Sequence, residues 1–187
     1  MNSISKNAVV SPKAKIGDNI TIKDFAVIED DVILKDNIVI GTNALICNGT
    51  RMSSNNQVYH SAVLGSTPQD LKFKGEFTTL EIGENNVFRE FVTISRGTTD
   101  RNKTVIGNNC FLMAYVHVPH DSVIGDDVNG LQSRRVGPAT GLIHVPQQHV
   151  CLLGLQARHA KQRFVELAGV PISFGVESVC VPIGLRP

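Results

Sequence analysis

The sequence predicts an all-β fold in which six-residue repeats coil into a solenoid with three short parallel strands per coil. Aliphatic residues recur at every sixth position, eleven times without a gap, and a second series, mostly small or apolar, stands four positions after them. An α-helix would need apolar spacings of three and four, and an ordinary strand a spacing of two. A fixed period of six is typical of hexapeptide solenoids. The first series comprises Ile4, Val10, Ile16, Ile22, Ile28, Leu34, Ile40, Ile46, Met52, Val58 and Leu64.

Each hexapeptide is expected to supply one flat strand and one corner, so that equivalent aliphatic residues stack from coil to coil at about 4.8 Å. The period restarts twice after interruptions. Glycine or asparagine follows many of the repeat aliphatics, as expected for corners that need a missing Cβ or a left-handed backbone. The restarted series are Ile82, Phe88 and Ile94, and then Ile106, Leu112, Val118 and Ile124.

Composition limits the possible functions. The chain has 187 residues, 42% of them hydrophobic, which is enough for one core and no clear second domain. A net charge of +1 gives no reason to expect nucleic acid or an anionic membrane as a partner. No secretion signal or membrane span is apparent, and the four cysteines form no CxxC pair. We therefore expect a cytoplasmic protein.

The first interruption of the period, residues 66–79, is too long for a corner and mixes charged with apolar residues. Within it, Asp70 and Lys72 lie two positions apart, so in an extended segment their side chains would point the same way. A carboxylate beside an ammonium suits a polyhydroxylated, phosphate-bearing ligand. The alternative is a solvated loop with an incidental ion pair. A second, polar interruption covers residues 96–104, and Arg89, one repeat earlier, is a candidate to brace this loop or a contact between subunits.

Two histidines lie on an otherwise aliphatic stretch where the period is intact. Val116 and Val118 keep their inward positions, so His117 and His120 are expected to project outward. Asp121 follows His120 directly, and a carboxylate can fix the tautomer of a histidine that acts as a general base. The alternative is a pair of ordinary surface histidines.

Together these motifs resemble the acyl carrier protein-dependent UDP-N-acetylglucosamine O-acyltransferases, which open lipid A biosynthesis. The resemblance covers residues 1–128 and is carried by Pro-Gln-Asp-Leu-Lys at 68–72 with Gly-Glu at 75–76. It continues through 88–90, 96–98 and 108–113 and ends at His-Val-Pro-His-Asp, 117–121. It implies a left-handed parallel β-helix that assembles as a homotrimer.

The resemblance also implies roles for individual residues. His120 would remove the proton from the sugar 3-hydroxyl as that oxygen attacks an (R)-3-hydroxyacyl thioester, and Asp121 would orient it. His117 would contact substrate, as would Gln69, Asp70 and Lys72 in the first loop, which reaches toward a neighbouring subunit. No metal and no resident cofactor are implied. The acyl donor would be acyl carrier protein, whose phosphopantetheine arm bears the acyl chain.

The pattern changes abruptly after Val128. Continuing the count of six places Gly130, Gln148 and Gly154 on the inward series, which do not suit an aliphatic ladder. The resemblance implies further coils, which would supply an oxyanion donor and measure the acyl chain, and then a C-terminal helical domain, but residues 129–187 match neither. We interpret them as an aberrant continuation of the β-helix domain, with a frame disturbance in the gene as one hypothesis and a divergent tail as the other.

Other functions fit parts of this pattern. A γ-type carbonic anhydrase is a β-helix that binds zinc through three histidines, and His117 and His120 would need a third, for which His60 is the upstream candidate. A non-catalytic scaffold would need only the period. An acetyltransferase that uses acetyl-coenzyme A shares the period but not the loop at 68–72.

Overall fold

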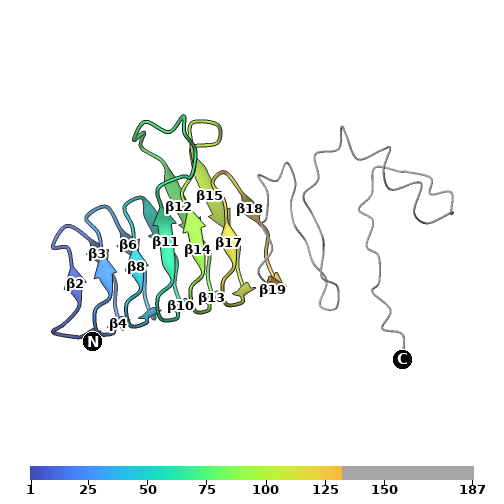
Figure 1. Cartoon of the computed structure of the whole chain (residues 1–187). Coiled ribbons are helices and arrows are strands. Elements are labelled where there is room, and N and C mark those ends of the chain that lie inside the picture. Colours follow the sequence, from blue (N-terminus) through green and yellow to red (C-terminus); the bar gives the residue numbers. More distant parts are fainter. Residues whose placement is uncertain (132–187) are drawn as a thin grey trace, which may run out of the picture.

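The computed structural model describes residues 1–131, which form a left-handed parallel β-helix without any α-helix (Figure 1). Successive strands join three different sheets in turn, and each strand pairs in parallel with the strand three places later in the chain. This is the predicted arrangement of three strands per coil. Within the described residues, no helix is long and apolar enough to cross a membrane.

The strands are short because the remaining residues of each hexapeptide form a corner. The first sheet contains β1 (Ser3–Ile4), β4 (Thr21–Ile22), β7 (Val39–Ile40), β10 (Gln57–Val58), β13 (Val87–Phe88), β16 (Phe111–Leu112) and β19 (Asn129–Leu131). The second contains β2 (Val9–Val10), β5 (Val27–Ile28), β8 (Leu45–Ile46), β11 (Val63–Ser66), β14 (Thr93–Ser95) and β17 (His117–Val118). The third contains β3 (Lys15–Ile16), β6 (Ile33–Leu34), β9 (Thr50–Met52), β12 (Thr79–Ile82), β15 (Lys103–Ile106) and β18 (Val123–Ile124).

The core is a set of vertical ladders of equivalent residues. Ile40 pairs with Ile22 on one side and Val58 on the other, and all three are at most 1% exposed. Burying an aliphatic side chain of this size stabilises the fold by about 1.5–3 kcal/mol. Ile4 differs, with 46% of its surface exposed, because β1 has a neighbouring strand on one side only.

The corners confirm the expectation for asparagine and refine the one for glycine. Asparagines at equivalent corners adopt positive φ, and Asn19 donates from Nδ2 to Oδ1 of Asn37 at 2.9 Å. Gly65 also has positive φ, at 82°. Gly41 does not, but a Cβ there would lie 2.7 Å from the backbone nitrogen of His60 in the next coil. Close approach between coils therefore requires this glycine.

One inward ladder includes two polar residues. Asn56 and Asn86 are at most 1% exposed and take the position that isoleucines, Ile20 and Ile38, occupy in the two preceding coils. Asn56 donates to the carbonyl oxygen of Gly83 at 2.8 Å and accepts from the N–H of Asn86 at 2.8 Å. The amides thus bond the corners of successive coils, so their buried polar groups have hydrogen-bond partners.

Both interruptions of the period form loops at the corner between the second and third sheets, where they project side by side (Figure 1). The first loop, residues 67–78, joins β11 to β12, and the second loop, residues 96–102, joins β14 to β15. Both are slightly shorter than predicted because the flanking strands extend into them. At the far end, β19 continues the coil just past Val128, with a register shift against β16. The expectation for the rest of 129–187 lies outside the described residues.

Candidate active site

The predicted catalytic pair occupies the corner between β17 and β18, the same corner from which both loops project one and two coils earlier. His120 Nδ1 lies 2.7 Å from Asp121 Oδ2. The His120 side chain is 23% exposed and that of Asp121 is 7% exposed. When Nδ1 donates its proton to the carboxylate, the lone pair of the neutral ring resides on Nε2. The pair therefore presents a basic nitrogen beside an almost buried carboxylate, which is the arrangement a general base requires.

Asp121 is fixed by more than its histidine. Its Oδ1 accepts from the backbone N–H of Thr98 at 2.9 Å and of Arg101 at 3.3 Å, and its Oδ2 accepts from the Thr98 hydroxyl at 2.6 Å. Its own N–H donates to Thr104 Oγ1 at 2.9 Å, and its φ is 60°. Burial alone would raise the pKa of Asp121, but the hydrogen bonds from Thr98 and His120 hold it below the usual value. The carboxylate is therefore stabilised in its ionised form.

His117 lies on β17 and projects from the outer side of the second sheet, whereas Val118 beside it is fully buried, as predicted. Its Nδ1 lies 2.8 Å from the hydroxyl oxygen of Thr93 on the neighbouring strand β14. The direction of this hydrogen bond depends on the histidine tautomer. The bond ties the His117 ring to the neighbouring strand β14.

The segment at Asp70 and Lys72 is not extended, so the side-chain geometry predicted for an extended segment does not apply. The chain turns here, because Asp70 Oδ1 accepts from the N–H of Lys72 at 2.9 Å and the Asp70 carbonyl oxygen accepts from the N–H of Phe73 at 3.0 Å. An aspartate side chain that bonds the backbone two residues on commonly forms such a turn. Gln69 and Lys72 are exposed and Asp70 is half-buried, so polar groups of this loop remain accessible.

Sequence reasoning missed the residue that joins the two loops. The guanidinium carbon of Arg96 lies 5.4 Å from the ring centroid of Phe73, and Arg96 Nη1 donates to the carbonyl oxygen of Asn48 at 3.2 Å. Sequence reasoning also assigned no role to Thr98. Both lie in the motif 96–98, which was noted as part of the resemblance, but a period of six contains no information on contacts between loops.

Arg89 does not contact the second loop. Its Nε lies 3.0 Å from Glu90 Oε2, and its guanidinium carbon lies 4.6 Å from the ring centroid of Tyr59. Both partners belong to the corner between the first and second sheets, so Arg89 braces that corner. The hypothesis that it serves the loop at 96–104 is therefore wrong.

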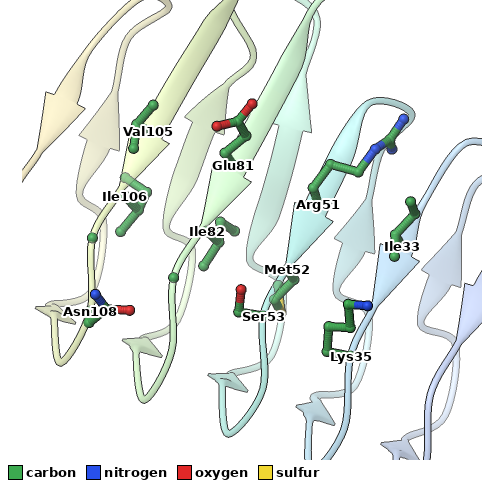
Figure 2. Close-up of a pocket in the computed structure, with 12 residues that line it drawn as sticks. Ile33, Lys35, Arg51, Met52, Ser53, Glu81, Ile82, Val105, Ile106 and Asn108 are labelled. Carbon is green, nitrogen blue, oxygen red and sulfur yellow. The ribbon is translucent and has the colours of Figure 1, made fainter.

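A shallow groove lies on the outer face of the third sheet (Figure 2). Ile33, Arg51, Glu81 and Val105 come from four adjacent strands and line it together with the corner residues below them. Arg51 is bonded to Asp31 through both carboxylate oxygens, at 2.7 and 2.8 Å. None of the six predicted site residues lines the groove, which is therefore separate from the catalytic pair.

The carbonic anhydrase alternative gains no support from residues 1–131. Among them, no group of three histidine, cysteine, aspartate or glutamate side chains is placed to hold a metal ion. His117 bonds to Thr93, and His120 to Asp121, whereas His60 packs its ring against Phe91 with 5.4 Å between centroids. Each of these histidines thus has a different neighbour within the chain.

A β-helix of six-residue repeats with a His-Asp pair at a loop-bearing corner is the arrangement expected of a hexapeptide-repeat transferase. A family model described as bacterial transferase hexapeptide (six repeats) matches residues 103–129. Among curated proteins, the chain is 57% identical over 126 residues to the acyl-[acyl-carrier-protein]–UDP-N-acetylglucosamine O-acyltransferase of Helicobacter pylori strain J99. It is 43% identical over 127 residues to the enzyme of the same name from Saccharophagus degradans. Each match covers 67% of this chain.

Solved structures agree. The UDP-N-acetylglucosamine acyltransferase of Bacteroides fragilis superposes with a TM-score of 0.67 at 48% identity, over 67% of this chain and 49% of that one. The Campylobacter jejuni enzyme gives 0.64 at 34% identity, over 68% and 50%. Over the matched part, about two thirds of its length, the chain is therefore a homologue of the UDP-N-acetylglucosamine O-acyltransferases. It spans about half the length of the curated relatives it matches, 47% of the first and 49% of the second.

Proposed function

We propose that this protein transfers an (R)-3-hydroxyacyl chain from acyl carrier protein to the 3-hydroxyl of UDP-N-acetylglucosamine, the first step of lipid A biosynthesis. The observation that carries the proposal is the hydrogen bond from His120 Nδ1 to the ionised Asp121, at the corner beside both loops. The names of the relatives supply the substrates, since each is called an acyl-[acyl-carrier-protein]–UDP-N-acetylglucosamine O-acyltransferase.

In the proposed mechanism, His120 Nε2 accepts the proton of the sugar 3-hydroxyl as that oxygen attacks the thioester carbonyl carbon. The thiolate of the phosphopantetheine arm leaves and takes the proton from the His120 imidazolium, so the acyl group moves to the sugar without an acyl-enzyme and the base is regenerated. Asp121 stabilises the imidazolium that forms. A general base of this kind contributes about 10²–10⁴-fold to the rate. The proposal includes neither a metal nor a resident cofactor.

Substrate binding is assigned to the accessible polar groups near this corner. His117 projects from the second sheet, and Gln69, Asp70 and Lys72 lie in the first loop. A lysine ammonium suits the diphosphate of a sugar nucleotide, and amide and carboxylate groups suit its hydroxyls. We further propose a homotrimer, in which the first loop would reach the site of a neighbouring subunit, and a cytoplasmic location, where both substrates would be met.

Acyl transfer tests the proposal directly. Purified protein is supplied with (R)-3-hydroxyacyl carrier protein and UDP-N-acetylglucosamine, and the acylated sugar nucleotide is measured. Turnover is expected, and His120→Ala should lower kcat by about 10²–10⁴-fold, the contribution of a general base. His60→Ala is the matched control, because His60 lies at a different corner and packs against Phe91.

The alternatives predict different results. Turnover with acetyl-coenzyme A and none with the carrier protein would indicate an acetyltransferase. Absence of turnover with every donor, in a protein whose β-helix is intact by circular dichroism, would contradict the proposal and favour a scaffold. Equal losses in His120→Ala and His60→Ala would contradict the assigned base.

A further inference from the structure

We propose that Thr98 is a positioning residue of the catalytic site: its hydroxyl and its backbone N–H together hold the Asp121 carboxylate in the plane that orients His120. This inference rests on the proposed function, in which His120 is the base. Nothing in the hexapeptide period assigns Thr98 a role, because the residue lies in the second loop, outside the repeats.

Two donors of Thr98 face the two oxygens of the Asp121 carboxylate, and we call this pair of hydrogen bonds the fork. The Thr98 N–H lies 2.9 Å from Oδ1, and the Thr98 Oγ1 lies 2.6 Å from Oδ2. Two donors from one residue on the two oxygens of one carboxylate restrict rotation about its terminal torsion. His120 Nδ1 then meets Oδ2 at 2.7 Å, on the oxygen that the hydroxyl holds. The hydroxyl therefore sets the position of the atom that fixes the histidine.

The direction of the hydroxyl is determined by a third contact. Thr98 Oγ1 accepts from the N–H of Asp100 at 3.3 Å, and an ionised carboxylate can only accept. The hydroxyl proton therefore points to Asp121. Thr98 is 5% exposed, so a water molecule has little access to replace the bond if the hydroxyl is removed.

The backbone around Thr98 is itself fixed. Its carbonyl oxygen accepts from the N–H of Asn102 at 2.7 Å, and the Gly97 N–H donates to the carbonyl oxygen of Thr79 at 3.1 Å. The first bond closes the second loop on itself, and the second ties the loop to β12. The fork is thus built on a rigid base, which a positioning role requires.

The test uses Thr98→Val, which removes the hydroxyl and keeps the size and the backbone N–H, and Thr98→Ser, which keeps the hydroxyl. Thr99→Val is the control, since Thr99 is an exposed neighbour in the same loop. Two readouts are taken on the full chain: steady-state kcat and KM for acyl transfer, and ¹⁵N NMR of the histidine rings, with His120 assigned through His120→Gln. The NMR readout requires no turnover.

For Thr98→Val we expect kcat to fall about tenfold while KM for UDP-N-acetylglucosamine stays within about twofold, since only the orientation of the base changes. The neutral Nδ1–H tautomer of His120 should become less populated. Thr98→Ser should restore both readouts, and Thr99→Val should alter neither.

An unchanged His120 tautomer in Thr98→Val would overturn the inference, and so would a kcat loss that Thr98→Ser shares. If Thr98→Val does not fold, Thr98→Ala is measured in its place by the same two readouts. If the wild-type protein shows no acyl transfer but Thr98→Val still changes the His120 tautomer, the positioning role is supported and the proposed function is overturned, so the two failures are distinguishable.

Discussion

The guanidinium carbon of Arg96 lies 5.4 Å from the ring centroid of Phe73, and this contact joins the second loop to the first. The same arginine donates to the carbonyl oxygen of Asn48 at 3.2 Å, which ties the pair to the body of the β-helix. The loop that carries Asp70 and Lys72 is therefore contacted by a residue of the loop that bonds the Asp121 carboxylate. In the proposed mechanism, substrate binding and the orientation of the base would therefore both depend on Arg96 and its loop.

Loss of the contact between Arg96 and Phe73 should weaken sugar nucleotide binding more than it slows the chemical step. Arg96→Gln and Phe73→Leu are each expected to raise KM for UDP-N-acetylglucosamine about threefold to tenfold, the range expected from a lost cation–π contact of about 1 kcal/mol. Steady-state kinetics check this, with the exposed Lys74→Gln as control. A loss confined to kcat would contradict the assignment.

The Asp121 carboxylate should be indispensable in its ionised form. Asp121→Asn keeps the shape, but its amide can donate to His120 Nδ1 and so favour the tautomer with the proton on Nε2. That nitrogen could then no longer accept the substrate proton. We expect kcat to fall about 10²–10³-fold. Retention of most activity would show that His120 acts without this carboxylate.

Acid should destabilise the fold partly through Asp121. Its pKa in the folded protein lies below the ordinary value of 3.8 because Thr98 and His120 donate to it, although burial acts in the opposite direction. The group therefore contributes stability above its unfolded pKa, and this contribution is lost as pH falls through the folded pKa. Between about pH 5 and pH 3, urea unfolding should show a smaller decline in Asp121→Asn than in wild type. An identical decline in both would show that the carboxylate contributes nothing, and Asp100→Asn, an exposed residue of the same loop, is the control.

Truncation of a buried asparagine in the inward ladder should lower the free energy of unfolding substantially. Asn56→Ala removes the bonds to the carbonyl oxygen of Gly83 and the N–H of Asn86, both at 2.8 Å, and leaves these groups without their partner. The free energy of unfolding should fall by about 2–4 kcal/mol, since each unsatisfied group costs about 1–3 kcal/mol. Ile38→Val, in the same inward series, should cost about 1 kcal/mol. Equal costs in the two variants would contradict the structural role of the amide.

The sequence by itself determined the coil. A period of six with an inward aliphatic residue specifies a strand and a corner in each repeat. Three repeats complete one coil, so residues 18 positions apart stack on one another. Ile22, Ile40 and Val58 could therefore be placed in one ladder without coordinates. It also determined that His117 projects outward, because Val118 beside it had to face the core. The adjacency of His120 and Asp121 in the chain made their hydrogen bond foreseeable.

Only the tertiary structure decided what the loops do. The contacts of Arg96 with Phe73 and of Thr98 with Asp121 join residues 23 positions apart, outside the repeats, and no periodic rule relates them. The turn at Asp70 was missed because a side chain that bonds the nearby backbone overrides the extended geometry that spacing alone suggests. Local pattern fixed the β-helix, whereas packing between segments distant in the chain set the orientation of Asp121 and of the first loop.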